Sequence, residues 1–250
     1  MSKIKITDFK GEADKHNTFE GYNKEALSPH GKKLLKEWKK INQLARSSDV
    51  ITYIVRKRNR EGLPKEYEII FNINSIVGVK KPNGVDTFSK NEKNEQQLRE
   101  PIFGNVHRLS IVLPNNYPSA YGGNPEFKMI TDTWHPNIRA SGKFKGRICL
   151  NNKDLGVRIG LDERIIRVGK YLQYQIYWAN ETYPWPEDKT VAEWVRDEAE
   201  PNKWVNINEG IYTDYSTLYT ADKSFENTKS IKSIAGKEEE SDAGNLTIKI

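Results

Sequence analysis

The stretch TWHPNIRASGKFKGRICLNN, residues 133–152, lies between two parts of the chain with different hydrophobic patterns. Before it, apolar and polar side chains alternate with the period of two that is typical of β-strands. After it, apolar side chains recur with the period of an α-helix. Residues 133–160 have no clean period and carry four glycines, which predicts an irregular segment. Strands and helices segregated in this way indicate an α+β fold, in which helices pack against an antiparallel sheet.

Four strands are predicted before this segment. They are residues 49–56 (DVITYIVR), 65–73 (KEYEIIFNI), 104–114 (GNVHRLSIVLP) and 125–132 (PEFKMITD). The second and third have the clearest alternation, at Tyr67, Ile69, Phe71 and Ile73, and at His107, Leu109, Ile111 and Leu113. Residues 80–101 are polar and rich in turn-forming side chains, so they predict a loop. Hairpin-like links between successive strands favour a four-stranded antiparallel meander.

Helices are predicted on both sides of the strands. Residues 28–45 place Leu34, Trp38, Ile41 and Ala45 on one helical face. The rest of that helix is crowded with lysines, namely Lys32, Lys33, Lys36, Lys39 and Lys40. These lysines form either a solvated face or a basic docking surface.

Two further helices are predicted after the irregular segment. Residues 161–180 form one, with Asp162 as the N-cap and an inward stripe of Ile165, Val168, Leu172 and Ile176. A capping box of Thr190 and Glu193 predicts the start of the other. We expect residues 1–28 to be an N-terminal extension, residues 29–204 to be the core, and residues 205–250 to be a polar C-terminal tail.

The composition limits the class of protein. The formal net charge of +6 favours acidic partners but is too weak to indicate nucleic acid. A single cysteine cannot form an internal disulfide, and no segment has the apolar length of a signal peptide or a membrane span. We therefore expect a cytoplasmic protein with neither a nucleic acid nor a membrane as its partner.

The chemistry-bearing residues are few. The chain has no glycine-rich phosphate loop, and its four histidines are scattered, so no metal site is predicted. The one cysteine, Cys149, lies between two apolar residues and, taken alone, is typical of a small buried hydrophobe. Taken alone, His135 is typical of a structural hydrogen-bonding group and Asn137 of a turn residue.

In combination, these residues resemble the ubiquitin-conjugating enzyme family. The features that match, in order, are Leu113-Pro114 and Tyr117-Pro118, then Pro125 and Phe127, then Trp134-His135-Pro136-Asn137-Ile138, and finally Gly146 and Ile148-Cys149-Leu150. The tripeptide His-Pro-Asn is a weak signal by itself, but the ordered set within a compatible order of helices and strands is specific. The resemblance covers residues 29–204.

The sequence also departs from the family pattern. Cys149 follows Asn137 by 12 positions, a few more than is usual, and the additional residues lie in RASGKFKGR, residues 139–147. The run SAYGGN, residues 119–124, is extended, and the usual tryptophan-proline signature after the cysteine is missing. These departures are typical of a divergent member, such as one from a bacterial ubiquitin-like conjugation system.

The resemblance implies an acyltransferase that needs no cofactor. Cys149 would accept the C-terminus of a ubiquitin-like protein from an activating enzyme as a thioester, and would then yield it to a lysine of a protein target. Asn137 would stabilise the oxyanion, and Asp188, with Glu187 as the alternate, would orient the lysine. His135, Pro136 and Tyr117 would be structural. The lysine-rich helix would meet the activating enzyme.

The basic loop between the two motifs has two interpretations. Arg139, Lys143, Lys145 and Arg147 are its cations. If they lie near the sulfur, they raise the fraction of thiolate, because positive charge favours the anion. Otherwise the loop is simply exposed and solvated.

Two other functions remain open from the sequence. A cysteine hydrolase would use His107 or His135 as the base for Cys149, and this requires an imidazole nitrogen within hydrogen-bonding reach of the sulfur. A non-catalytic binding module of the same fold is the other alternative, and full burial of Cys149 would favour it.

Overall fold

A computed structural model of the chain describes residues 21–80, 98–117, 123–150, 159–206 and 210–211. All of these belong to one compact unit within residues 1–220. Most of the predicted N-terminal extension, of the loop at 80–101 and of the C-terminal tail lies outside the described residues.

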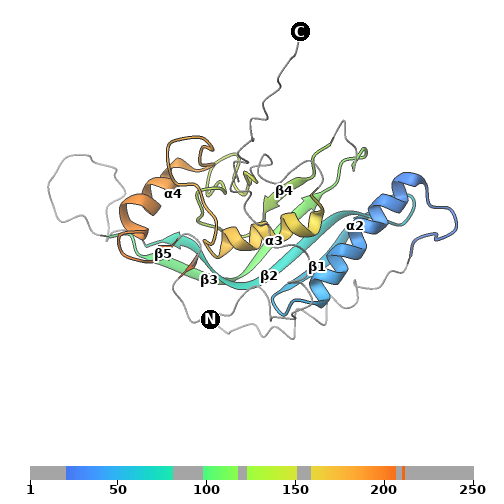
Figure 1. Ribbon diagram of the computed structural model, residues 1–250, viewed down its shortest axis with the longest axis horizontal. Coiled ribbons are helices and arrows are strands. Elements are labelled where there is room, and N and C mark those ends of the chain that lie inside the picture. The colour runs from blue at the N-terminus through green and yellow to red at the C-terminus, as the bar shows by residue number, and fades with distance from the viewer. Residues whose placement is uncertain (1–20, 81–97, 118–122, 151–158, 207–209, 212–250) are drawn as a thin grey trace, which may run out of the picture. The chain divides into compact units, whose positions relative to one another are not determined.

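The described residues form an α+β fold, as the sequence predicts (Figure 1). The elements in chain order are α2 (Pro29–Arg46), β1 (Ile51–Arg58), β2 (Pro64–Val79), β3 (Pro101–Val112), β4 (Glu126–Met129), α3 (Leu161–Leu172), α4 (Lys189–Trp194), the π-helical turn η1 (Val195–Ala199), β5 (Val205–Asn206) and β6 (Gly210–Ile211). Among them no helix has the length and apolar character needed to cross a bilayer.

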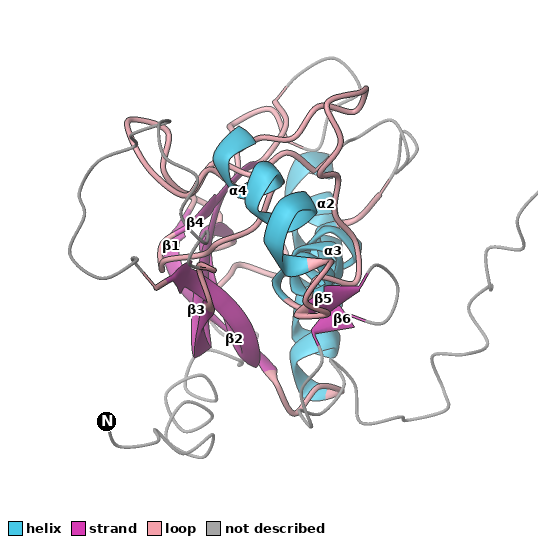
Figure 2. Ribbon diagram, turned by 90° about the vertical axis from the view of Figure 1, so that its left-hand side faces the viewer, coloured by secondary structure: helices cyan, strands magenta, loops and turns pink. Residues whose placement is uncertain are grey.

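The main sheet is the predicted antiparallel meander, with the strand order β1-β2-β3-β4. Ile69 of β2 pairs with Tyr53 of β1 and with Leu109 of β3, and Leu109 pairs in turn with Met129 of β4. All four side chains are buried, so this row lies on the inner face of the sheet. Figure 2 shows the sheet on one side and helices α2, α3 and α4 on the other.

The core consists of two clusters. The first is built from α2, α3 and the inner face of the sheet, and includes Trp38, Phe71 and Ile165. The second surrounds Trp194 of α4 and takes Ile76 from the far end of β2. Strand β2 therefore contributes to both clusters.

Helix α2 follows the predicted pattern. Ser28 caps its N-terminus by accepting a hydrogen bond from the Gly31 amide at 2.9 Å, and Pro29 occupies the first helical position, where no amide donor is needed. The predicted apolar face is buried. The Trp38 indole donates to the hydroxyl of Tyr53 on β1 at 2.9 Å, which fixes the helix against the sheet.

Helices α3 and α4 differ from the prediction at their ends. Gly160, and not Asp162, occupies the N-cap position of α3, and the helix ends at Leu172 instead of residue 180. Asp162 lies in the first turn and pairs with Lys40 of α2 at 3.5 Å. Helix α4 begins at Lys189 and is capped by Asp188, so the predicted capping box of Thr190 and Glu193 is wrong.

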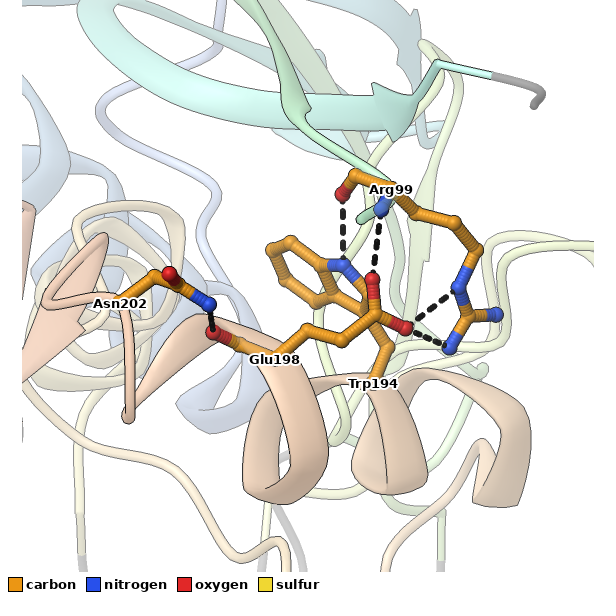
Figure 3. A network of polar contacts seen from close by, with 4 residues as sticks. All are labelled: Arg99, Trp194, Glu198 and Asn202. Atoms are coloured by element: carbon orange, nitrogen blue, oxygen red, sulfur yellow. Dashed lines mark hydrogen bonds and ion pairs between the residues drawn. The ribbon is translucent and has the colours of Figure 1, made fainter. Parts of the chain in front are cut away.

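A polar network ties the segment before β3 to the helical end of the core (Figure 3). The Glu198 carboxylate of η1 accepts from the Arg99 backbone amide at 2.6 Å and pairs with the Arg99 guanidinium at 2.5 Å. The Trp194 indole donates to the Arg99 carbonyl oxygen at 2.9 Å. Both backbone polar groups of Arg99 are thus satisfied by side chains from α4 and η1.

Candidate active site

The segment between Asn137 and Cys149 is a short hairpin. Cys149 N donates to Asn137 O at 2.9 Å, Arg139 N donates to Arg147 O at 2.9 Å, and Gly146 N donates to Arg139 O at 2.8 Å. These bonds place the two predicted motifs side by side at the base of the hairpin. The additional residues of the long link form its tip, away from Cys149.

The hairpin is attached to the edge of the main sheet. Arg147 forms a bridge with Lys128 of β4, and Met129 N donates to Gly146 O at 2.8 Å. Gly146 has φ +84°, and a Cβ atom at this position would collide with the Met129 carbonyl oxygen. Only glycine combines that backbone conformation with so close an approach.

The side-chain amide of Asn137 is oriented by a single hydrogen bond. Asn137 is fully buried, and its Oδ1 accepts from the backbone amide of Trp178 at 3.0 Å. Since an N–H group must face an oxygen, this contact assigns the two ends of the amide. Asn137 Nδ2 is buried and has no hydrogen-bond partner in the described part of the chain. Both N–H donors of this nitrogen therefore remain uncommitted in the described part of the chain, on a residue whose backbone pairs with Cys149.

His135 supports the loop that carries Asn137. Its Nδ1 accepts from Asn137 N at 3.1 Å, so Nε2 carries the proton and donates to the Ile176 carbonyl oxygen at 3.2 Å. Burial lowers the pKa of His135 to about 3, against the smaller opposing effect of the bond to Ile176. The ring also stacks on Tyr171, with centroids 5.0 Å apart. This buried imidazole thus links the loop of Asn137 to the segment after α3.

Cys149 is partly exposed and is not a core residue. The hydroxyl of the buried Tyr171 donates to the Cys149 carbonyl oxygen at 3.2 Å and accepts from Arg167 Nε at 3.1 Å. Because Tyr171 also stacks on His135, one side chain of α3 contacts both walls of the site. Full burial of Cys149, the condition that would favour the binding-module alternative, is not met.

Neither histidine is placed as a base for Cys149. In the described residues no hydrogen bond joins the Cys149 sulfur to an imidazole. Both nitrogens of His135 are engaged elsewhere. His107 is fully buried within β3, its Nε2 lies 3.1 Å from the carbonyl oxygens of Ile73 and Gly104, and its Nδ1 has no partner. The hydrolase alternative therefore lacks the contact that it requires.

Asp188 connects helix α4 to the loop of the site. Its Oδ1 accepts from Val191 N at 3.3 Å as the N-cap, and its Oδ2 accepts from Ala140 N at 2.9 Å. Its own amide donates to the Pro136 carbonyl oxygen at 2.9 Å. The side chain is buried, and each carboxylate oxygen already has a donor. These contacts are those of a residue that positions the loop.

Most of the basic residues of the hairpin are paired with carboxylates. Glu187 accepts from Arg147 at 2.7 Å and lies 3.4 Å from Arg139, while Lys145 pairs with Asp132 at 2.5 Å. Three of the four cations thus form ion pairs, and two of them, Arg139 and Arg147, share one carboxylate. Lys143 makes no ion pair with the described residues, and its ammonium lies 5.7 Å from the ring of Phe144.

The other predicted residues are placed as follows. Pro136 and Tyr117 are buried, and Tyr117 N donates to the Pro114 carbonyl oxygen at 3.0 Å in a turn at the end of β3. On α2, Lys32, Lys33, Lys36 and Lys39 are exposed, while Lys40 is partly covered and pairs with Asp162. The helix therefore carries a row of exposed lysines on the side away from the core.

Sequence reasoning did not identify Trp178 and Tyr171 as parts of the site. Both come from the segment 161–180, which was predicted to be one continuous helix. No spacing rule relates Trp178 to Asn137, because their contact depends on where α3 ends. The available signal in the sequence was that both residues are aromatic, since aromatic residues often line binding and active sites. The rings of Tyr171 and Trp178 meet edge to face, with centroids 5.9 Å apart.

The described residues contain no group of three or more histidine, cysteine, aspartate or glutamate side chains arranged to hold a metal ion. Comparisons with known proteins add no identification, because no protein-family model and no curated protein matches the chain.

Proposed function

We propose that the chain is a divergent ubiquitin-conjugating enzyme. In this proposal Cys149 carries a ubiquitin-like protein as a thioester and transfers it to a lysine of a protein target. The α+β order, with one basic helix before an antiparallel sheet and helices after the cysteine, is compatible with that family's fold.

The reaction consists of two acyl transfers. First, the Cys149 thiolate attacks the carbonyl carbon of the modifier's C-terminus, the new C–S bond forms, and the thiolate of the activating enzyme leaves. Next, a neutral lysine amine attacks the same carbon, the C–S bond breaks, and the Cys149 thiolate leaves as the nitrogen loses a proton. Both steps pass through a tetrahedral intermediate with a negative oxygen, and in this proposal the Asn137 donor acts on the intermediate of the second step, the transfer to lysine.

The observation that carries the proposal is the state of the Asn137 amide. Its oxygen is held by Trp178 N, its nitrogen has no partner in the described residues, and its backbone pairs with Cys149. A buried donor without an acceptor costs free energy, commonly about 1–3 kcal/mol. In this proposal the acceptor is the oxyanion, which is present only during the reaction.

The test begins with an acyl probe that needs no activating enzyme. The full chain is incubated with a short synthetic peptide thioester that ends in glycine and has mercaptoethanesulfonate as its leaving group. We expect an adduct on Cys149 that is visible by intact mass spectrometry and removed by dithiothreitol. Cys149→Ala should give no adduct, and free lysine should discharge the loaded wild-type protein.

Asn137→Asp distinguishes an enzyme from a merely reactive thiol. The variant keeps an oxygen for Trp178 N but removes the amide donor, so it should load normally and discharge to lysine about 100-fold more slowly. Asn137→Ala, which also removes the acceptor, should be slow as well and less stable. Absence of the adduct, or an equal discharge rate in Asn137→Asp and the wild type, would contradict the proposal.

A further inference from the structure

The tip of the hairpin presents an exposed surface that the proposed chemistry does not use. We name it the hairpin patch, and it consists of Lys128, Ile130, Lys143, Phe144 and Arg147. Ile130 and Phe144 are 53% and 51% exposed, which is high for large apolar side chains.

These side chains share one side of the sheet edge. Lys128 of β4 and Arg147 of the hairpin are cross-strand partners, and partners of this kind project from the same face. Ile130 follows Lys128 by two residues and still pairs with β3 through the Arg108 carbonyl oxygen, so it lies on that face too. The Arg147 guanidinium lies 4.5 Å from the Phe144 ring centroid, which brings the tip residue to the patch.

The patch is fixed relative to Cys149. Arg147 N donates to Phe144 O at 3.0 Å, Lys145 pairs with Asp132, and Gly146 is bonded to Met129 of β4. Phe144 precedes Cys149 by five positions. At about 3.3 Å per extended residue, the patch is at most about 17 Å from the nucleophile.

Two of the three cations of the patch make no ion pair with the described residues. Glu187 neutralises Arg147, but Lys128 and Lys143 have no carboxylate partner in the described parts of the chain. A cation over the face of an aromatic ring is favourable and leaves the ring edges, which are also electropositive, at the surface. An acidic segment with an apolar residue complements such a surface.

We infer that the hairpin patch binds an acidic, apolar segment of the target protein next to the lysine that is modified. This inference rests on the proposed function. During discharge the modifier is already attached to Cys149 by the thioester, so the target is the partner that needs a noncovalent surface within reach. The acidic residues of the target would lie about five extended residues from its lysine.

The experiment compares two lysine peptides as acceptors. One has two glutamates and a leucine about five positions from its single lysine, and its twin has glutamines in place of the glutamates. The chain is loaded on Cys149 with the synthetic peptide thioester, and single-turnover discharge to each peptide is followed by mass spectrometry. We expect the acidic peptide to react about fivefold faster, since each exposed charge pair contributes little by itself. The preference should vanish at about 0.5 M salt, because salt screens the interaction between exposed charges.

Variants of the patch locate the effect. The double variant Lys128→Glu, Lys143→Glu should lose or reverse the preference, and Phe144→Ala should slow the acidic peptide. The matched controls are Lys24→Glu, an exposed lysine before α2, and Phe103→Ala, a 42% exposed phenylalanine on β3. Both controls should keep the preference, and all four variants should load with the probe at the wild-type rate.

The outcomes separate the two proposals. Failure to form the thioester overturns the proposed function and this inference with it. Normal loading and discharge with equal rates for both peptides overturns the inference alone. A change in loading instead of discharge in the patch variants also overturns it, and would assign the surface to the acyl donor.

Discussion

His135 holds the candidate site in place through hydrogen bonds to two backbone groups. It accepts from Asn137 N and donates to Ile176 O, so it must stay neutral in the folded protein. His107 is also buried and bonded to backbone carbonyl oxygens, and its pKa is lowered to about 4, mainly by burial. Both pKa values lie below the ordinary histidine value of about 6.5.

This predicts a loss of stability in mild acid. Below pH of about 6.5 the unfolded chain binds protons that the folded chain excludes, so the free energy of unfolding decreases as the pH falls toward 4. Each histidine should contribute a loss of about 1.4 kcal/mol between pH 7.5 and 5.5. Urea unfolding at the two pH values measures it, and His107→Phe should remove about half of this component. Ring signals of His107 and His135 that titrate near pH 6.5 in NMR spectra would contradict the assignment.

Two glycines of the hairpin offer a matched test of its attachment to β4. Gly146 and Gly142 both have positive φ, at +84° and +75°, but only Gly146 approaches other backbone closely. Gly142→Ala should cost about 1 kcal/mol for its backbone conformation alone. Gly146→Ala should cost at least about 1 kcal/mol more, because the Met129 carbonyl oxygen must move. Equal losses in urea unfolding would show that the hairpin and β4 are not tightly joined.

At the scale of elements, the strands and the ends of α2 could be predicted, but the end of β2 at Val79 and the end of α3 at Leu172 could not. The alternation of apolar and polar residues correctly predicted that Ile69, Phe71 and Leu109 lie on the buried face. This works because alternate side chains of a strand point to the same face of the sheet. The end of α3 is set by tertiary contacts. After Leu172, the buried Tyr174 adopts φ +57°, and its hydroxyl donates to the Trp134 carbonyl oxygen. No pattern in the local sequence predicts this contact.

For the candidate site, too, the local motifs could be predicted from the sequence, but the tertiary contacts could not. Asn137 and Cys149 were found because they belong to local motifs, and the hairpin does bring them together. The groups that orient Asn137 and its neighbour His135 come from the segment after α3, namely Trp178 N for Asn137 and Ile176 O for His135. These are backbone atoms, which carry no residue-specific sequence signal. The same holds for Asp188, whose partners Ala140 N and Val191 N are also backbone groups.

The connection between η1 and the segment before β3 should contribute measurably to stability. Glu198 and Arg99 are 15% and 27% exposed, and Glu198→Ala would leave the guanidinium and amide of Arg99 without their acceptor. We expect a loss of about 2 kcal/mol in urea unfolding. The nearby pair of Lys80 and Glu100 is exposed, so Glu100→Ala should cost at most about 0.5 kcal/mol. Equal effects would mean that the network of Figure 3 adds nothing beyond a surface ion pair.

At the scale of the whole described unit, β2 joins the two core clusters. Its residues Tyr67, Ile69, Phe71 and Ile73 belong to the first cluster, and Ile76 belongs to the second. We therefore expect one cooperative unfolding transition. Leu109→Ala in the first cluster and Val195→Ala in the second should lower the free energy of unfolding by about 3 and about 2 kcal/mol. In each variant the single midpoint of urea unfolding should move to a lower urea concentration. Circular dichroism and tryptophan fluorescence should superimpose, and two separate transitions would contradict this coupling.

The pairing of Asn137 with Cys149 at the base of the hairpin has a consequence for how the chain can change in length. Residues inserted between Ala140 and Lys145 would extend the turn without altering the 2.9 Å bond between Cys149 N and Asn137 O. The placement of Cys149 beside Asn137 and the length of this loop are therefore separate variables. A peptide grafted at this tip would stay attached to the base of the hairpin, so its sequence could be changed without moving Cys149 relative to Asn137.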